Sequence, residues 1–237
     1  MLKKILPLAA IIGALTFSTV AKAESTSVFT GFDAKKNSYY LYAGGVTALQ
    51  GQDILTQDGF LVRGMLGFGQ YTYKTVAVPG GSVDGDVYDA DLMLGYGHFF
   101  DGGSISVYLG PNYENQDLSP NDASNSANGD KVGAKGQLEL TINPVANISA
   151  GAIGAYSTAY RTYWSQLHAE YDFGSFKLGP EVSFLGNKEY DQQRYGAALR
   201  DIDVGFAKTK LYVGWANSDG ANSDDSIYGG IGFSRAF

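Results

Sequence analysis

The sequence predicts an all-β protein, an antiparallel up-and-down transmembrane β-barrel of about 12 strands, with about 10 strands as the alternative. Three observations predict this fold. Many short runs alternate between apolar and polar residues, the connections between runs are largely short and long in turn, and the last run, 228–237, ends on Phe237. A carboxy-terminal strand ending on an aromatic residue looks like the closing strand of a bacterial outer-membrane barrel. We therefore expect the barrel-assembly machinery of a Gram-negative outer membrane to recognise it.

Residues 1–23 have the features of a secretory signal peptide. Two lysines near the start precede the mostly apolar stretch 5–20, and small residues surround a cleavage site before Glu24. The apolar stretch is shorter than the roughly 20 residues that a membrane-spanning helix needs. We expect the general secretory route to export the chain and the signal to be removed, which leaves 24–237 as a single outer-membrane barrel domain.

The composition narrows the class of protein further. Removal of the signal takes away three of the 17 basic residues, so the mature chain has a net charge of 14 − 24 = −10. A nucleic-acid partner is not expected, because it would need a basic surface. The absence of cysteine excludes a disulfide framework and cysteine metal sites. The 32 glycines alternate with Tyr, Phe, Leu and Val, which does not favour a disordered linker.

The clearest alternating run is 131–142. Its even-numbered residues are apolar or glycine, and its odd-numbered residues are polar or glycine. A period of two places these sets on opposite faces of one strand. In a barrel in lipid the apolar face points outward and the polar face lines the lumen, whereas in a soluble sandwich the apolar face is the core. The predicted strands are 26–33, 38–50, 60–75, 86–100, 104–115, 131–143, 145–156, 162–173, 175–186, 192–203, 208–218 and 226–237.

The connections between these strands favour the membrane barrel over the sandwich. Very short junctions are predicted at 101–103, 143–144 and 174–175, and long polar loops at 76–85, 116–130 and 219–225. This alternation is typical of periplasmic turns and extracellular loops. The segment 51–59 is the exception, because it lies on the short side and is not short. An even number of strands places both chain ends on the periplasmic side, with the first strand, near 28–32, paired to the last.

Aromatic residues gather near the predicted strand ends, where the interfacial girdles of outer-membrane barrels lie. The alternative is a set of core aromatics in a soluble β protein. The residues concerned are Tyr39, Tyr40, Tyr42, Phe68, Tyr71, Tyr73, Tyr96, Phe99, Phe100, Tyr156, Tyr160, Tyr163, Tyr171 and Phe173.

No catalytic, metal or cofactor site is predicted. The two histidines, His98 and His168, are too few for a histidine metal cluster. His168 has carboxylates at 170 and 172, about 7 Å or more along the strand, so a Ser–His–acid site stays open. No serine motif such as Gly-x-Ser-x-Gly accompanies it, and a lumen histidine in a polar network is the alternative. The acidic stretch 84–91 lacks the glycine and final glutamate of a calcium loop.

Charges of both signs fall on the predicted lumen face. They would form a plug if paired, or a lining for polar solutes if unpaired, and the sequence leaves both open. Aromatic Tyr108, Trp164 and Tyr212 stand beside amides and carboxylates, a combination that can bind sugars, although packing aromatics are the alternative. The candidate contacts for a polysaccharide are Tyr108, Lys135, Glu139, Trp164, Gln166, His168, Glu170, Glu181 and Arg194.

Three segments, Asn37–Gln50, Leu118–Leu140 and Ser157–Ala197, together resemble the cellulose biosynthesis protein BcsS family of alphaproteobacteria. The most specific part runs from Thr162-Tyr-Trp-Ser to Tyr190-Asp-Gln-Gln-Arg194. The resemblance implies an outer-membrane or envelope protein associated with cellulose production and export, and it supplies no catalytic motif. We expect Asn187, Asp191, Gln192 and Gln193 to lie in a signature-like extracellular loop.

The expected function is a monomeric barrel that assists cellulose or exopolysaccharide secretion, as a conduit or as a surface anchor. Its expected partners are outer-membrane lipid, cellulose or an oligosaccharide, and the cellulose secretion machinery. Two alternatives remain. One is an outer-membrane enzyme that modifies lipid or glycan through His168, and the other is a structural, adhesin-like barrel whose loops 116–130 and 187–191 bind surfaces.

Overall fold

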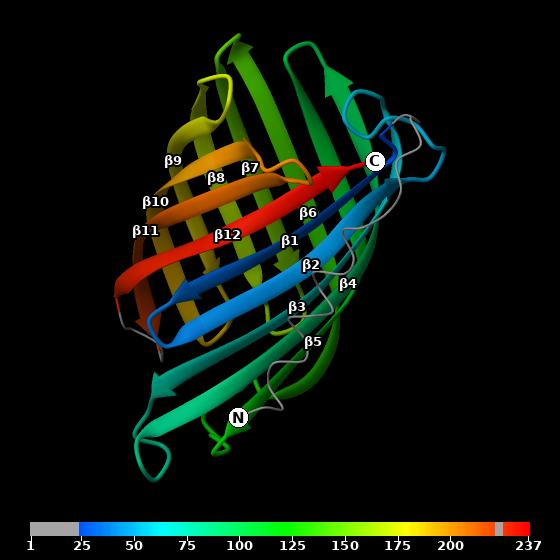
Figure 1. The fold of residues 1–237 in the computed structure, drawn as a ribbon. Coiled ribbons are helices and arrows are strands. Elements are labelled where there is room, and N and C mark those ends of the chain that lie inside the picture. The colour runs from blue at the N-terminus through cyan, green and yellow to red at the C-terminus, as the bar shows by residue number, and fades with distance from the viewer. Residues whose placement is uncertain (1–23, 221–224) are drawn as a thin grey trace.

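The computed structural model describes residues 24–220 and 225–237, so the predicted signal peptide lies outside the described residues. The chain forms a closed antiparallel barrel in which each strand pairs with its neighbours in sequence and β1 pairs with β12 (Figure 1). This confirms the 12-strand prediction over the alternative. The strands are β1 (Thr26–Lys35), β2 (Ser38–Ala48), β3 (Gly59–Lys74), β4 (Ser82–Phe100), β5 (Gly103–Ser119), β6 (Gly129–Val145), β7 (Ile148–Ser157), β8 (Tyr163–Asp172), β9 (Lys177–Gly186), β10 (Tyr190–Asp203), β11 (Lys208–Gly220) and β12 (Ser226–Ala236).

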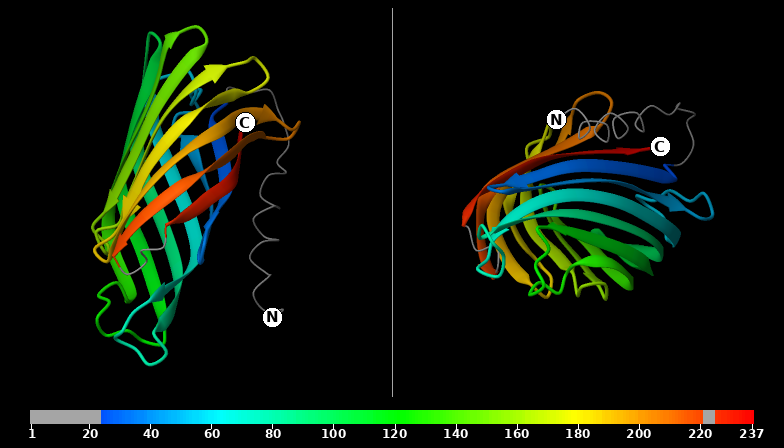
Figure 2. Two further views of the ribbon diagram at one scale, coloured as in Figure 1. Left: turned by 90° about the vertical axis from the view of Figure 1, so that its left-hand side faces the viewer. Right: turned by 90° about the horizontal axis from the view of Figure 1, so that it is seen from below.

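The barrel closes by pairing of β1 with β12, as predicted from the strand-like run that ends on Phe237. Phe32 pairs with Ile231, and the ladder continues to the chain end, where the Phe237 N–H donates to the Thr26 carbonyl at 2.8 Å. The views in Figure 2 show the barrel from the side and from below, with the C-terminus at the end where β1 begins. A closed ring leaves no strand edge with unpaired backbone groups. The membrane interior requires this pairing, because it offers no water to bond such groups.

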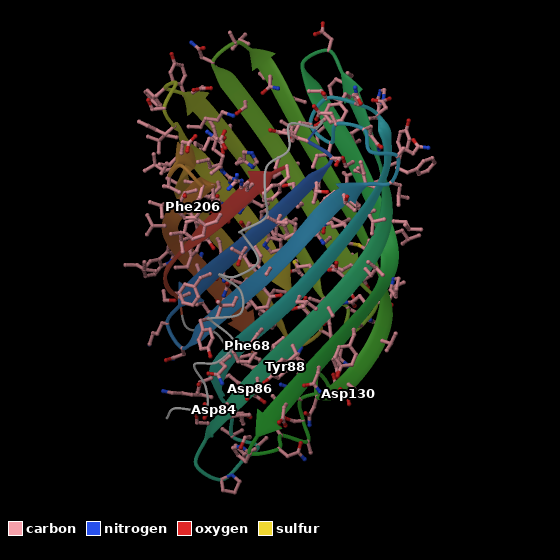
Figure 3. The ribbon with its side chains drawn as sticks, turned by 45° about the vertical axis from the view of Figure 1, so that its right-hand side comes forward. Phe68, Asp84, Asp86, Tyr88, Asp130 and Phe206 are labelled. Atoms are coloured by element: carbon pink, nitrogen blue, oxygen red, sulfur yellow. The ribbon has the colours of Figure 1, made fainter. Side chains whose placement is uncertain are left out.

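The two faces of the wall differ as the alternation predicts. Leu66, Leu109 and Val132 point outward and are largely exposed, whereas Arg63 and Asp91 point inward and are buried. Figure 3 shows the two ends of the apolar band: Phe206 marks one, and Phe68 with Tyr88 marks the other, beyond which lie Asp84, Asp86 and Asp130. An apolar band bordered by aromatics and then by charges is the pattern of a membrane-spanning barrel.

The high glycine content has a packing cause. The Tyr40 ring lies across Gly67, and the Tyr228 ring lies across Gly196 and Gly214. A Cβ atom at any of these glycines would overlap the ring. Lumen aromatics can lie flat on the wall only where a neighbouring strand offers no side chain.

Three strands extend further at the extracellular end than the sequence predicts. Segments 82–85, 116–119 and 129–130, predicted as loop, belong to β4, β5 and β6. Beyond the membrane both faces of a strand are polar, so alternation disappears although the ladder continues. Side-chain hydrogen bonds support it there, such as that from Thr72 Oγ1 to Asp84 Oδ1 at 2.7 Å. The lower end of Figure 1 shows this extension of β4, β5 and β6.

The junction predicted at Asn143-Pro144 is also wrong. β6 continues to Val145, and the turn is formed by residues 146–147. The pairing with β7 shifts between Ile142 and Val145, which marks an irregularity that accommodates a proline in the strand. The junctions at 101–103 and 174–175 are confirmed, with Gly102 and Gly174 at positive φ of 80° and 88°.

The exceptional periplasmic connection, 49–58, folds back onto the barrel. Ile54 packs against the buried cluster of Leu61, Met93 and Tyr108. Asp58 Oδ1 accepts the Phe99 N–H at 2.7 Å, and its other oxygen is 2.6 Å from His98 Nδ1. These bonds hold the pKa of Asp58 below its ordinary value. Within the described residues, no helix is both long and apolar enough to cross a bilayer.

Candidate functional site in the lumen and at the extracellular mouth

The first group of lumen charges lies on β3, β4 and β6. Arg63 Nη1 is 3.1 Å from Asp91 Oδ1, and Lys135 Nζ is 2.5 Å from Asp91 Oδ2. Arg63 Nε is also 4.0 Å from Glu139 Oε1. The Asp91 side chain has no exposed surface. A buried carboxylate is stable only when it is paired, and here both of its oxygens have a cationic partner.

The second group lies on the opposite part of the ring, on β8–β11. Glu181 Oε2 is 2.8 Å from Arg200 Nη2 and 2.8 Å from Lys210 Nζ. Arg200 also pairs with Glu170. Gln166 Oε1 accepts from Arg200 at 3.2 Å and from Lys210 at 3.3 Å. This group therefore neutralises its two cations with two carboxylates from neighbouring strands.

A third pair joins β10 to β1. Arg194 Nη1 is 2.9 Å from both oxygens of Asp33, and the Tyr212 hydroxyl donates to Asp33 Oδ2 at 2.9 Å. The Arg194 guanidinium also lies over the Tyr228 ring, 4.8 Å from its centroid. The pair tightens the closure region by linking strands on both sides of the β1–β12 seam.

Among the ion pairs between described residues, none crosses the lumen. Each joins positions on strands at most three apart around the ring, as in Arg63–Glu139 and Arg194–Asp33. The lumen charges are therefore paired, as in a plug, but the pairs follow the wall and do not bridge it. Paired charges are expected of a plug, and pairs that lie along the wall are expected of a lining for polar solutes. These were the two arrangements that the sequence left open.

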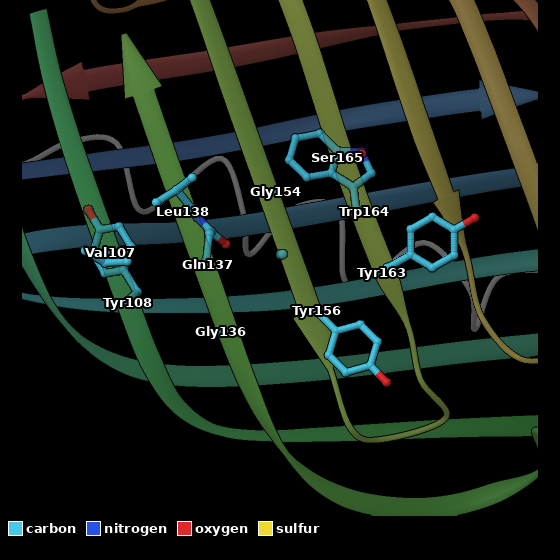
Figure 4. Close-up of a pocket in the computed structure, with 11 residues that line it drawn as sticks. Val107, Tyr108, Gly136, Gln137, Leu138, Gly154, Tyr156, Tyr163, Trp164 and Ser165 are labelled. Atoms are coloured by element: carbon cyan, nitrogen blue, oxygen red, sulfur yellow. The ribbon is translucent and has the colours of Figure 1, made fainter.

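The predicted polysaccharide contacts lie on the lumen face by register but do not form one site. Lys135 and Glu139 belong to the first group, Gln166, Glu170 and Glu181 to the second, and Arg194 to the third. Tyr108 packs in the apolar cluster near the periplasmic loop. Trp164 lies between the groups on β8, and 37% of its surface is exposed. A pocket of about 430 Å³ runs along β5–β8 next to Tyr108, Gln137 and Trp164, with lining from both faces of the sheet (Figure 4).

His168 has no nucleophile beside it. Its Nε2 is 3.8 Å from Glu170 Oε1, and its Nδ1 is buried without a hydrogen-bond partner in the structure. The imidazole lies over Gly151 of β7. Within the described residues, no serine or threonine hydroxyl bonds to this ring, so the geometry lends no support to a Ser–His–acid mechanism.

The extracellular mouth carries a structure that sequence reasoning missed, which we call the cap: residues 120–128, 158–162 and 187–189. The Tyr73 hydroxyl of β3 donates to Asp122 Oδ2 at 2.8 Å and accepts from Asn125 at 3.1 Å. The Ser126 N–H donates to Glu189 Oε1 at 3.0 Å. The loop between β5 and β6 is thus tied to β3 on one side and to the β9–β10 connection on the other, so it crosses the opening.

Tyr160 lies at the centre of the cap and is almost fully buried. Its hydroxyl donates to the Gly129 carbonyl at 2.7 Å, and its own carbonyl accepts the Lys188 N–H at 3.2 Å. The ammonium groups of Lys131 and Lys188 each lie 5.4 Å from the centroid of its ring. Tyr160 therefore joins its own segment to the β9–β10 connection and to the start of β6, which directly follows the segment 120–128.

The predicted signature-like loop is mostly strand. Asn187 lies in the connection, but Asp191, Gln192 and Gln193 belong to β10, because the pairing with β9 begins at Asp191–Gly186. Gln192 faces the lumen and donates to Ser218 Oγ at 2.6 Å. Asp191 and Gln193 face outward, where they accept the hydroxyls of two outward tyrosines.

The sequence matches the cellulose biosynthesis protein BcsS family over residues 27–237, which is nearly the whole chain. The chain belongs to this family. The family implies a role in cellulose biosynthesis, and the described barrel is of the bacterial outer-membrane type. No curated protein matches the sequence.

Solved structures with a similar fold are outer-membrane barrels. The translocator domain of the autotransporter NalP from Neisseria meningitidis is 9% identical, with a TM-score of 0.50, over 99% of this chain and 95% of that one. The TodX deltaS2S3 monoaromatic hydrocarbon channel is 9% identical, with a TM-score of 0.51, over 90% of this chain and 91% of that one. The KdgM porin is 13% identical, with a TM-score of 0.47, over 89% and 99%. At these identities the likeness concerns the fold alone.

Proposed function

We propose that this barrel serves cellulose biosynthesis by holding glucan at the outer surface of the outer membrane, and that it is not a pore for the polymer. The observation that carries the proposal is the bridged mouth. Asp122 is tied to β3 and Ser126 to the β9–β10 connection, so the segment between them lies across the path that a polymer would take. A barrel of this size also leaves limited room, because side chains occupy much of the interior of small barrels.

The cap has the chemistry of a surface for a neutral polysaccharide. Its longest segment, 120–128, is rich in Asn and Ser and contains no basic residue. Hydroxyl and amide groups can donate to and accept from sugar hydroxyls. Asn121 and Asn128, which are exposed and bonded to each other at 2.8 Å, stand at the outer surface of this segment.

A second candidate function is passage of short saccharides. It is favoured by the ion pairs that follow the wall, because these leave the lumen unbridged between the β3–β6 and β8–β11 groups. This candidate requires the cap to open, whereas the surface function does not.

Binding of the full-length protein, in detergent, to amorphous cellulose particles tests the proposal. We expect the protein to sediment with cellulose and a variant with 121–127 replaced by a Gly-Ser linker to remain in solution. Asp117→Asn is the matched control, because Asp117 is an exposed residue of the same extracellular extension outside the cap. Equal sedimentation of the linker variant would exclude the surface function. A steady current through the intact protein in planar bilayers, blocked by cello-oligosaccharides, would favour passage instead.

A further inference from the structure

We propose that the lumen contains a second, periplasm-accessible binding groove on β6, β7 and β8 for a short neutral saccharide. The groove arises because β7 contributes only small or apolar residues to the lumen face. In its first cross-strand row, Ala155 lies between Gln137 of β6 and Trp164 of β8. With neighbouring strands about 4.8 Å apart, the two flanking side chains stand about 10 Å from each other, with a methyl group as the floor.

The second row lies one step nearer the periplasm and has the larger side chain of an isoleucine as its floor. Ile153 lies between Glu139 and Gln166. Gln166 bonds to Ser183, Arg200 and Lys210, so it forms a fixed wall. Successive rows are separated by about 7 Å along the strands, which gives a groove long enough for more than one sugar ring.

The third row closes the groove. Gly151 pairs with His168, and the imidazole lies over the glycine, where any larger residue would collide with it. His168 Nδ1 is buried and has no partner in the structure. The groove thus ends on the imidazole ring, whose Cε1 and Nε2 atoms lie over Gly151.

Two side chains show that the groove is open. Trp164 is 37% exposed, and the Glu139 side chain is 38% exposed, whereas Gln137 and Gln166 beside them are buried. The exposed part of the indole is a large apolar surface without protein cover, which is unfavourable in water. A sugar ring would cover the indole with its C–H face while its hydroxyls bond to the Glu139 carboxylate.

The charge of the groove selects for a neutral ligand. Glu139 is the one charged group in its first two rows, and Gln137 Nε2 and Arg63 already lie 2.6 Å and 4.0 Å from its Oε1. A uronic acid would be repelled by the Glu139 carboxylate, and a cationic ligand would compete with Arg63. A neutral pyranose meets neither obstacle.

A ligand reaches this part of the lumen from the periplasmic end and enters the groove sideways from the lumen, because the third row closes the groove on its periplasmic side. The contacts of loop 49–58 lie with β3, β4 and β5 and with residue 24, so this loop leaves the β6–β8 part of the opening uncovered. The cap covers the other end. The groove therefore lies on the opposite side of the cap from the surface in the proposed function, and it does not depend on that function.

The chain itself provides the test, because it has two tryptophans. Trp164 faces the lumen and Trp215 faces outward, so Trp215→Phe leaves a single reporter in the groove. We expect cellotetraose, a neutral β-linked tetramer, to change the fluorescence of this variant in detergent in a saturable way. The Trp164→Phe variant should show no change, and tetragalacturonate should have no effect on either. Glu139→Gln in the Trp215→Phe background should weaken binding about tenfold or more, because a bond to a charged group is lost.

A matched pair on β7 separates occupancy of the groove from damage to the barrel. Ala155→Leu fills the floor and should abolish the fluorescence change, whereas Ala152→Leu, between the outward Leu140 and Leu167, should leave it intact. Both variants should keep the slow-migrating folded form on unheated gels. Binding that survives Ala155→Leu, or an equal response in Trp164→Phe, would overturn the groove. Failure of cellulose sedimentation with an intact fluorescence response would instead overturn only the surface function.

Discussion

The two ends of the barrel are closed in different ways. At the extracellular end the cap is polar and is tied by hydrogen bonds to β3 and to the β9–β10 connection. At the periplasmic end loop 49–58 is apolar where it packs, with Ile54 on Leu61, Met93 and Tyr108, and its contacts remain on one side. The first arrangement spans the opening and the second covers part of it. The barrel is therefore bridged at its extracellular end and covered on one side at its periplasmic end.

Release of the cap should have the largest effect. The double variant Tyr73→Phe, Glu189→Gln removes the hydroxyl that holds Asp122 and weakens the acceptor for Ser126. Each lost bond to a charged group is worth about 1.5–3 kcal/mol, so the open population should rise about tenfold or more. Single-channel recording in planar bilayers measures this as open probability.

Asp117→Asn serves as the control for that recording and should behave like the intact protein. Ile54→Ala at the other end should change the open probability little, because the cap still spans the mouth. Equal opening by Ile54→Ala would mean that the two ends close the barrel alike, contrary to the structure.

Ile54→Ala should instead lower stability. Ile54 is partly buried against three core side chains, so its truncation should cost about 1–2 kcal/mol, less than for a fully buried isoleucine. Urea unfolding in lipid vesicles, followed by gel mobility, measures the free energy. The neighbouring Leu55 is 53% exposed, and Leu55→Ala should change the free energy by less than about 0.5 kcal/mol. A loss at Leu55 as large as at Ile54 would show that the loop packs differently.

Much of this asymmetry lies beyond the reach of sequence reasoning. The strand number, the β1–β12 seam and the lumen face of Trp164 or Glu181 follow from a period of two, which is local. The Tyr73–Asp122 bond joins residues 49 positions apart, and no local pattern encodes it. The Asp-x-Ser spacing at 122–124, which here forms a local turn, was the available signal for an ordered cap.

The grouping of the lumen charges was out of reach for a related reason. Alternation tells which face a residue takes, but not which residues meet around a tilted ring. Lys210 could have been assigned to the lumen face, because it precedes Tyr212, a predicted lumen residue, by two positions on one strand. Its pairing with Glu181, two strands away, could not be predicted.

Acidification should loosen both ends together. Bonds from Ser124 and Tyr73 hold the pKa of Asp122 below its ordinary value, and bonds from Phe99 and His98 do the same for Asp58. A lowered carboxylate pKa contributes stability that is present above the unfolded pKa of about 3.9 and is lost as pH falls through the folded pKa. Both closures should therefore be unchanged from pH 7 to about 5 and weaken below about pH 4. Protease cleavage within 120–128 and 49–58, measured against pH, checks this. Loosening of either loop near pH 6 would require a different titrating group.

The smallest expected effect concerns Tyr160 and tests whether the cap is one unit. Each ammonium on its ring should contribute about 0.5–1 kcal/mol. Lys131→Ala and Lys188→Ala should each raise the rate of cap cleavage by a few-fold at low salt. Because Lys131 lies on β6 and Lys188 on the β9–β10 connection, the double variant shows whether the segments open together. If they do, both single variants expose 120–128 and 158–162 equally. If Lys188→Ala exposes its own connection alone, the cap consists of independent loops, and the bridge across the mouth depends on Asp122 and Ser126 only.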